Sequence, residues 1–499
     1  MVLLLTLLLP SVSVPIIYML GKKSGKIAAL AVALVSIADL SLLLTTVSTV
    51  LTYGKHVESY YWIPMLGSEF TLFVDGVSLC MAVVTLILIV AAAIYSINYM
   101  EEKTALSGYY ALLSLLTIGL VGVFITSNLL VFYFCWELML IPTYFIIGGW
   151  GYKEPYRAAF KFFIFTHAGA VFVLLSIGAV YMFTNNLDML DIQTLKLLEG
   201  ASTDAVKWIL VSFTLGFAVK MAIVPVHMWL PDAHSEAPAP MSALLSGVII
   251  EAGAYAIFRV SLTTVFPSIA ASAFGTQFLH VLMIFGVLSA FYGAFTALVE
   301  NDIKRIVAYS SISHMGYILF GLSLFPFSVN GVAYGSVEGV VGTVLHLVNH
   351  AVSKGLLFLV AGSIMKQTGV RDIREMGGLA GKMPLTAVSS ALAVFSIAGV
   401  PPLACFISEF LIFVGGVQAS GSDSFYFWST FLMLVATIFS LAYVLRFFLK
   451  VFLQSLKIKE VKEAPIFMTI AMIALAVLVL MLGVWPSFFM DLINSVSFG

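Results

Sequence analysis

Long apolar segments, separated by short polar joins, follow one another along almost the whole chain. A helix that crosses a bilayer needs about 20 apolar residues, and counting such runs predicts about fourteen spans. The spans are expected at residues 2–20, 27–52, 74–98, 109–126, 128–148, 157–184, 207–227, 239–262, 276–298, 304–326, 338–365, 385–415, 428–455 and 464–487. The first run has no basic segment before it and no clear cleavage site, so we expect a first span and not a signal peptide. The pattern predicts an all-α membrane protein.

Composition supports this fold class. Of the 499 residues, 61% are hydrophobic and 10% are charged, whereas soluble domains carry about 25% charged residues. No basic patch is interleaved with aromatic residues, so we expect the lipid bilayer and no nucleic acid as surroundings. The three cysteines, Cys80, Cys135 and Cys405, lie far apart in apolar runs. They predict neither a disulfide framework nor a metal site.

The positions of the basic residues predict the orientation. Most of the 24 lysines and arginines fall in the joins that precede even-numbered spans. By the positive-inside rule that side is cytoplasmic, so both termini lie outside a multi-pass protein of the cell membrane. Glu58, Glu69 and Asp75 fall at or beyond the outer boundary, and we expect them to be solvated.

Titratable side chains occur inside several of the predicted spans. A charged group at the bilayer centre costs about 3 kcal/mol, so such groups are kept where they have a use. A single buried pair can be a structural clamp, and a lone histidine is usually a core residue. Several such groups on separate helices favour proton transfer instead. The candidates are Glu137, Lys220, Glu251, His346, His350, Lys354 and Glu409.

The segment HLVNHAVSK in the eleventh span has the most informative spacing. It places His346, His350 and Lys354 at positions i, i+4 and i+8. On a helix these residues form one stripe about 12 Å long. Imidazole titrates near neutral pH. Two imidazoles and an amine in a line within the membrane therefore predict a proton relay.

The seventh span contains prolines that interrupt its helix. Pro225 and Pro231 follow Lys220 within a few residues, and a proline removes a helix hydrogen bond and clashes with the preceding turn. Irregular backbone at membrane depth is tolerated only where protein or water covers it. We therefore expect a wet cavity beside Lys220. The polar run HMWLPDAH, with His227 and His234, is expected to line it.

The twelfth span has a similar break, at Pro401 and Pro402 before Glu409. Five spans separate the two breaks, so spans 4–8 and 9–13 form two five-helix units, each broken at its fourth helix. An odd number of spans inverts the second unit in the membrane. The sequence thus predicts N-terminal helices, a first repeat, an inverted second repeat and a C-terminal helix. These segments cover residues 1–108, 109–262, 263–455 and 456–499.

Four long motifs carry a family resemblance. LGFAVKMAIVPVHMWLPDAHSEAPAPMSALLSG, VENDIKRIVAYSSISHMGYILFGL, HAVSKGLLFLVAG and REMGGLAGKMPLTAV resemble the antiporter-like membrane subunits of respiratory complex I. They are also similar to subunits of multi-subunit cation/proton antiporters and membrane-bound hydrogenases. The stretch FYFCWELMLIPTYFIIGGWG and the chain length resemble the subunit M, or subunit 4, type. The resemblance covers about residues 70–450.

The resemblance implies a fold and a function. It implies fourteen helices with two inverted five-helix units, and a non-redox subunit of a translocating oxidoreductase. Electrons would pass from NADH, or from a deazaflavin- or ferredoxin-type donor, to a quinone or similar acceptor. Flavin, iron–sulfur clusters and quinone are expected in partner subunits and no cofactor in this chain. The implied partners are sister antiporter-like subunits and, indirectly, a peripheral redox arm. Glu137 is implied to pair with Lys220, and Glu409 to end the exit path.

Two departures from the family pattern leave alternatives open. Glu251 stands where M-type subunits usually have a lysine, and Lys354 is a lysine that they often lack. We predict that Lys354 takes the central relay position with Glu251 as its counter-charge. The alternatives are a subunit of a Mrp-type Na⁺/H⁺ antiporter, a subunit of a membrane-bound hydrogenase, and a purely structural bundle.

Overall fold

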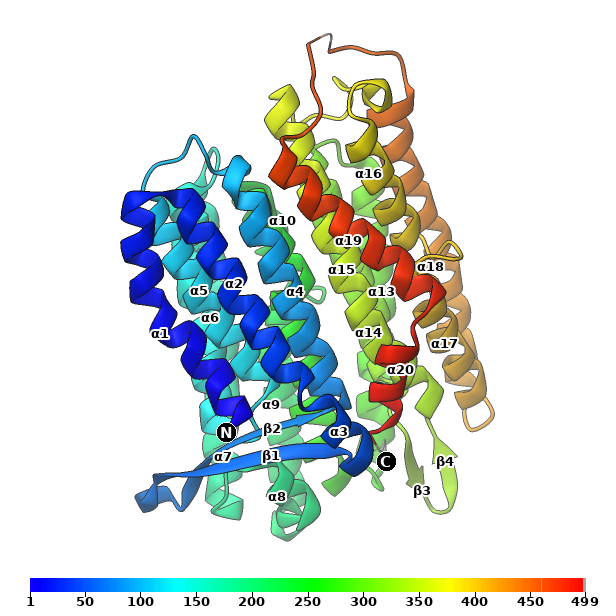
Figure 1. Cartoon of the computed structure of the whole chain (residues 1–499). Helices are drawn as coiled ribbons and strands as arrows, with labels where there is room; N and C mark the ends of the chain where they lie inside the picture. The colour runs from blue at the N-terminus through cyan, green and yellow to red at the C-terminus, as the bar shows by residue number, and fades with distance from the viewer. Residues whose placement is uncertain (459, 497–499) are drawn as a thin grey trace.

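Helices that run side by side make up most of the molecule in the computed structural model (Figure 1). The structure describes residues 1–458 and 460–496. Within these residues, 11 helices are long and apolar enough to cross a membrane, and each coincides with a predicted span. The chain is therefore a helical, multi-pass membrane protein.

The other three predicted spans are helical but differ from this pattern. The seventh and tenth correspond to α9 (Thr203–Met221) and α14 (Ile303–Leu322), whose sequences are less apolar. The twelfth is divided into two shorter apolar helices, α16 (Pro384–Ile397) and α17 (Ala404–Ala419). These three are the spans that hold Lys220, His314 and Glu409.

The chain begins with two long helices and a hairpin that crosses one end of the bundle (Figure 1). The hairpin pairs its strands antiparallel from Lys55–Asp75 to Ile63–Ser68. The start of the chain and α20, near its end, lie at this same end of the bundle. The elements are α1 (Val2–Lys23), α2 (Gly25–Leu44), α3 (Val47–Tyr53), β1 (Lys55–Ile63), η1 (Pro64–Leu66), β2 (Ser68–Asp75) and α4 (Gly76–Tyr99).

Two carboxylates of this end are buried, contrary to the sequence prediction, while Glu69 is exposed as predicted. Glu58 accepts hydrogen bonds from the backbone N–H groups of Leu3 and Leu4, at 3.1 and 3.2 Å. Burial raises the pKa of Glu58, but hydrogen bonds from the amino terminus, the Leu3 N–H, His56 and Tyr60 outweigh it and lower the pKa to about 2.

Asp75 has two structural roles. It caps α4 by accepting a hydrogen bond from the Ser78 N–H at 2.9 Å. It also forms an ion pair with Arg259, whose Nη2 lies 2.6 Å from Asp75 Oδ2. A paired arginine satisfies a buried carboxylate, so neither residue needs solvent at this position.

The next part of the chain contains the first break. Its elements are α5 (Leu106–Phe124), α6 (Leu129–Trp150), α7 (Pro155–Thr184), α8 (Met189–Thr194), η2 (Leu197–Gly200), α9, α10 (Leu230–Glu236), α11 (Ala239–Leu244), η3 (Leu245–Ile249), α12 (Ile250–Ala256), η4 (Ile257–Val265) and η5 (Phe266–Ser268). The segments from α11 to η5 form one continuous helix of 30 residues. It includes the π-helical turns η3 and η4.

The last part contains the second break. Its elements are α13 (Ala273–Val299), α14, β3 (Phe327–Val329), β4 (Val332–Tyr334), α15 (Val337–Thr368), η6 (Leu379–Gly381), α16, α17, α18 (Ser424–Phe448), η7 (Leu449–Leu453), α19 (Ile466–Val484) and α20 (Ser487–Asn494). Strands β3 and β4 form a short antiparallel hairpin at the same end of the molecule as β1 and β2 (Figure 1).

Both predicted breaks are confirmed. Helix α9 ends at Met221, its cap residue Ala222 has a left-handed φ of 59°, and α10 begins only at Leu230. Pro225 lies in this gap, whereas Pro231 lies in the first turn of α10, where a proline is tolerated. Pro231 therefore starts a helix and does not add a second interruption, as the sequence had suggested.

Two helices occupy the interior of the bundle. The most apolar windows of α15 and of the helix from α11 to η5 are both 100% buried within the chain. Peripheral helices instead expose large apolar side chains, among them Phe134, Leu175 and Trp428. Apolar side chains face outward at little cost where lipid or another membrane subunit surrounds the protein. These two helices carry the buried Glu251, His346, His350 and Lys354, whereas Lys220, His314 and Glu409 are buried on α9, α14 and α17.

Candidate functional site

The carboxyl group of Glu251 pairs with a histidine of the central helix α15. Glu251 lies in the first turn of α12, between η3 and η4, and His350 Nδ1 is 2.6 Å from its Oε1. Neither side chain is exposed. Burying a polar group costs free energy unless the group is hydrogen-bonded, so each of these two side chains stabilises the other in the interior. No ion pair joins Glu251 to Lys354 among the described residues, so the structure shows no direct contact between Lys354 and its predicted counter-charge.

Lys354 instead faces neutral partners on α14. Its Nζ donates to Ser310 Oγ and, at 3.5 Å, to the carbonyl oxygen of Val307. The side chain is fully buried, and within the described residues no ion pair holds it. Partners of this kind allow a lysine to gain or lose a proton without breaking an ion pair.

A residue outside the predicted set, His314, packs against both of the other two histidines. It belongs to α14, and its ring centroid is 5.5 Å from that of His346 and 5.4 Å from that of His350. His314 Nδ1 and His346 Nε2 are 3.3 Å apart, which is hydrogen-bond distance. The signal in the sequence was a lone histidine in SSISHMGYI, too common a feature to be singled out.

Glu409 lies at the second break and meets the histidines there. Its Oε1 is 3.9 Å from His314 Nδ1. A Cβ placed on Gly399, inside the break, would lie 2.5 Å from Glu409 Oε2. The side chain of Ser408, next to Glu409, is 2.9 Å from His346 Nδ1. The groups from Glu251 through the three histidines to Glu409 therefore form one contiguous line.

Lys220 lies in the last turn of α9, directly before the first break. Its Nζ donates to the carbonyl oxygen of Trp136 at 3.2 Å and lies 4.2 Å from the centre of the Trp136 ring. It forms no ion pair with Glu137 in the described structure. Glu137 Oε2 is instead 3.2 Å from His167 Nδ1, on α7. The direct Glu137–Lys220 pair implied by the family resemblance is thus absent here.

The two histidines near the first break have aromatic neighbours. The ring of His227 is 4.6 Å from that of Tyr292, edge to face. The ring of His234 is stacked on Phe358 at 4.5 Å, and neither of its nitrogens has a hydrogen-bond partner among the described residues. The structure therefore does not join His227 or His234 to the line between Glu251 and Glu409.

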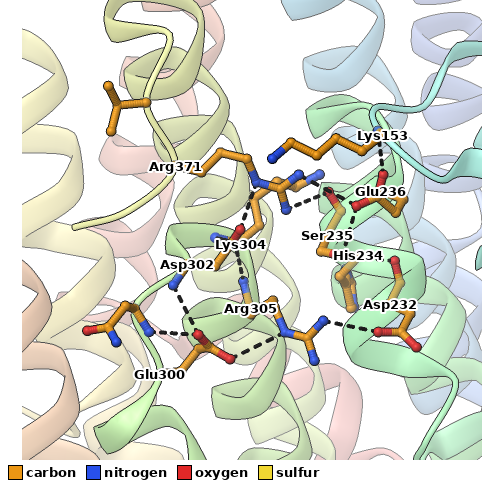
Figure 2. A network of polar contacts seen from close by, with 12 residues as sticks. Lys153, Asp232, His234, Ser235, Glu236, Glu300, Asp302, Lys304, Arg305 and Arg371 are labelled. Carbon is orange, nitrogen blue, oxygen red and sulfur yellow. Dashed lines mark hydrogen bonds and ion pairs between the residues drawn. The ribbon is translucent and has the colours of Figure 1, made fainter. Parts of the chain in front are cut away.

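An ionic network lies beside the first break, at the end of the bundle away from the hairpins (Figures 1 and 2). It links α10 to α14 and to the segment after α15. Arg305 Nη1 is 3.1 Å from Asp232, and Arg371 lies 2.7 Å from Asp302 and 3.6 Å from Glu236. Sequence reasoning missed this network because its members read as ordinary residues of cytoplasmic joins. The network ties the two halves of the chain together.

These features define a class of protein. Buried titratable groups on separate helices, placed beside broken helices inside a membrane bundle, are typical of proteins that move ions or protons. The family follows from the sequence comparison. A family profile described as "NADH:quinone oxidoreductase/Mrp antiporter, TM" matches residues 126–440. A second, described as "NADH-Ubiquinone oxidoreductase (complex I), chain 5 N-terminus", matches residues 62–110. The chain belongs to this family of membrane subunits, which confirms the resemblance seen in the motifs.

Curated relatives agree with the family profile. The chain is 35% identical over 442 residues to NADH-quinone oxidoreductase subunit M of Pseudomonas aeruginosa, covering 86% of this chain and 82% of the relative. It is 34% identical over 443 residues to the subunit M of Escherichia coli strain K12, covering 87% and 83%. The similarity therefore extends over most of both chains.

Solved structures share the fold. A chain of respiratory complex I from Thermus thermophilus superposes with a TM-score of 0.84 at 27% identity, covering 99% of this chain and 98% of that chain. A chain of an archaeal membrane-bound sulfane sulfur reductase gives 0.84 at 27% identity, covering 97% and 76%. A chain of the Mrp complex from Dietzia gives 0.86 at 21% identity, covering 98% and 96%, which shows the fold alone.

Proposed function

We propose that this chain is a proton-translocating subunit of a redox-driven, complex I-like pump. The observation that carries the proposal is the buried line in which Glu251 contacts His350, the rings of His350 and His314 adjoin, and His314 contacts His346 and Glu409. Such groups pass a proton between neighbours without a net charge entering lipid. The relatives named NADH-quinone oxidoreductase subunit M supply the redox context.

The proton path begins at Lys220 and ends at Glu409. Protons enter from the cytoplasm, pass from Lys220 to the centre near Lys354, and move along the Glu251–histidine line to the outside. Glu137 sets the charge near Lys220 through motion of its side chain or of His167. Outward transfer against a membrane potential requires about 2.3 kcal/mol per charge per 100 mV. Electron transfer in partner subunits that hold flavin, iron–sulfur clusters and quinone supplies this energy.

The chain forms fourteen spans with two inverted five-helix units, at residues 109–262 and 263–455, between segments 1–108 and 456–499. Close glycine contacts at equivalent helix pairs support the repeat. In the third and fourth helices of the first unit, a Cβ on Gly169 would lie 2.9 Å from Gly216 O. In the same helices of the second unit, a Cβ on Gly415 would lie 2.4 Å from Gly339 Cα.

The chain lies in the cell membrane with both termini outside, beside sister antiporter-like subunits. The basic joins before even-numbered spans support this orientation. The exposed apolar side chains of the peripheral helices support lateral contacts with other membrane subunits.

A second candidate is a subunit of a Mrp-type Na⁺/H⁺ antiporter or of a membrane-bound hydrogenase. The observation that favours it is the shared fold with the Mrp complex and with the archaeal sulfane sulfur reductase. Affinity purification of the tagged chain from its host separates the candidates. Copurifying iron–sulfur and donor-oxidising subunits support the redox pump, and only sister antiporter chains support the antiporter.

The test of mechanism is His314→Ala in the purified complex, reconstituted into liposomes. We expect proton translocation to fall by about tenfold or more, because general acid–base groups contribute that much or more to proton transfer. The matched control is His280→Ala, since His280 pairs with Asp423 at 3.3 Å outside the line. Full pumping by His314→Ala, with the complex intact, would mean that the line does not carry protons.

A further inference from the structure

Three donor atoms converge near the second break. His314 Nδ1 is 3.3 Å from His346 Nε2 and 3.9 Å from Glu409 Oε1. All three ligand atoms lie within 4.8 Å of one another, and all three residues are buried. They come from three different helices, α14, α15 and α17, so the packing of the bundle sets their spacing.

The donor set has the chemistry of a zinc site. Two imidazoles and one carboxylate are a common ligand set of Zn²⁺ sites that keep a fourth position for water. Bond lengths of about 2.0–2.2 Å in a tetrahedron put ligand atoms about 3.3–3.6 Å apart. The His314–His346 distance already matches, and Glu409 needs only a small movement. The sequence predicted no metal site, because these residues are far apart along the chain.

Outer partners hold the two rings in place. His346 Nδ1 lies 2.9 Å from Ser408 Oγ, and His314 Nε2 lies 3.4 Å from the Tyr443 hydroxyl. Histidines that bind metals usually use their second nitrogen in this way, which fixes the ring orientation. Asn349 donates to Ala404 O at 2.7 Å and so fastens the start of α17 to α15.

The surrounding charges permit a divalent cation. The Glu409 carboxylate offsets one positive charge, and Glu251, which reaches the site through His350, offsets a second. The opposing cation is Lys354, whose Nζ donates to Ser310 Oγ, one turn before His314 on α14. Tyr317 and Tyr443 add neutral groups beside His314.

The break in the twelfth span is the part of the site nearest the surface of the chain. Pro401 and Pro402, within the break, are exposed on the surface of the chain. Gly399, two residues before them, lies against the carboxylate of Glu409. A cation that reaches the break therefore meets Glu409 first and the two histidines behind it.

We propose that His314, His346 and Glu409 bind a divalent transition-metal ion such as Zn²⁺, and that the bound ion arrests proton transfer. Binding stands on the geometry alone, whereas the arrest rests on the proposed function. With the metal in place, both imidazole nitrogens and the carboxylate serve as ligands and cannot accept a proton. The site thus makes the exit half of the path sensitive to zinc.

The binding test uses the full chain, purified in detergent and freed of metal. We expect one Zn²⁺ per chain, with two nitrogen ligands and one protein oxygen at about 2.0–2.2 Å by X-ray absorption. With Co²⁺ as the probe, we expect the visible bands of tetrahedral cobalt. His314→Ala and Glu409→Gln lose both signals, while His280→Ala keeps them. Unchanged metal content in His314→Ala and Glu409→Gln overturns the site.

Two further variants distinguish the loss of a metal ligand from misfolding of the chain. Ser408→Ala keeps all three ligands and is expected to weaken metal affinity by about 10- to 100-fold. His346→Cys is expected to bind Co²⁺ with a new thiolate charge-transfer band that the native folded chain, whose Cys80, Cys135 and Cys405 are buried, does not show. Folded His346→Cys protein that binds Co²⁺ without this band shows that position 346 is not a ligand.

The arrest is tested in the reconstituted complex. Zn²⁺ is expected to stop proton translocation by the native complex, and Ser408→Ala to need about 10- to 100-fold more Zn²⁺ than the native complex does. If the chain binds Zn²⁺ but proton pumping continues, the proposed arrest of proton transfer is wrong, whereas the proposed metal site is unaffected. If Glu409→Gln pumps normally without Zn²⁺, the proposed function fails, whatever the metal measurements show.

Discussion

An acidic side chain, Glu251, and a basic one, His350, contact each other at 2.6 Å in the centre of the bundle, where neither is exposed. The second oxygen of Glu251 and the second ring nitrogen of His350 have no hydrogen-bond partner in the described part of the chain. Unpaired buried atoms of this kind cost free energy, so they are usually kept for a function. Under the proposed function, the pair accepts a proton from one side and releases it to the other.

Replacing Glu251 tests this role at a single residue. In Glu251→Gln the amide oxygen still accepts a hydrogen bond from His350 but cannot take up a proton. We expect proton translocation to fall by about tenfold or more, with little change in the melting temperature. Glu251→Ala is expected to lower the free energy of unfolding by about 1–3 kcal/mol, because His350 loses its partner. Proton-pumping and melting assays on both variants measure these effects.

The contrast between the two variants decides the interpretation. A purely structural pair predicts that Glu251→Gln pumps at the native rate and that only Glu251→Ala is impaired. That result would remove Glu251 from the proton path and leave His350 as a core residue.

At the scale of elements, the two broken helices position the site. Helix α9 stops just after Lys220, and α17 starts just before Ser408 and Glu409. Gly399, in the second break, has a φ of 65°, a left-handed conformation that residues with a Cβ adopt with difficulty. The break therefore depends on a glycine as well as on its prolines.

Gly399→Ala tests the second break. The new Cβ would lie 2.5 Å from Glu409 Oε2, and a left-handed conformation costs a residue with a Cβ about 1–2 kcal/mol. We expect Glu409 to be displaced, proton translocation to fall and the melting temperature to decrease.

The matched control is Gly178→Ala in α7, where the added methyl group meets no atom within 4 Å. This change is expected to be neutral or stabilising by about 0.5–1 kcal/mol, since alanine favours helix interiors. Equal pumping by the two glycine variants would show that the geometry around Gly399 does not matter for function.

At the scale of the whole molecule, the two ends of the bundle differ in construction. One end carries the two hairpins and the start of the chain, and the other carries the ionic network around Arg305 and Arg371 (Figures 1 and 2). Ion pairs between the two halves restrain their relative movement, and partly exposed pairs weaken as salt rises. The network end is the cytoplasmic end under the proposed orientation.

Cysteine labelling in whole cells tests this orientation. Tyr61 is 84% exposed on the hairpin β1–β2, and the side chain of Arg157 is 83% exposed at the opposite end. We expect an impermeant maleimide to label Tyr61→Cys in intact cells and Arg157→Cys only after the membrane is opened. The native cysteines are all buried and give little background. The reverse labelling pattern would place both termini in the cytoplasm.

The sequence by itself determined the membrane class, the positions of the helices, both breaks and most buried titratable residues. These features are local, because span length, proline chemistry and the cost of burying charge depend on nearby residues. The family also followed from motifs such as HAVSK. Pro231 was misjudged because a proline in a first turn and one inside a helix look alike in a sequence.

Only the tertiary structure decided which buried groups meet. It placed Glu251 against His350 instead of Lys354, and Glu137 against His167 instead of Lys220. It also brought His314 into the line and buried Asp75 beside Arg259. Each of these contacts joins different helices, and helix rotation and packing set such contacts, which spacing along one helix does not reveal. The residue types of the site can thus be read from the sequence, whereas the fold sets which of these residues contact one another.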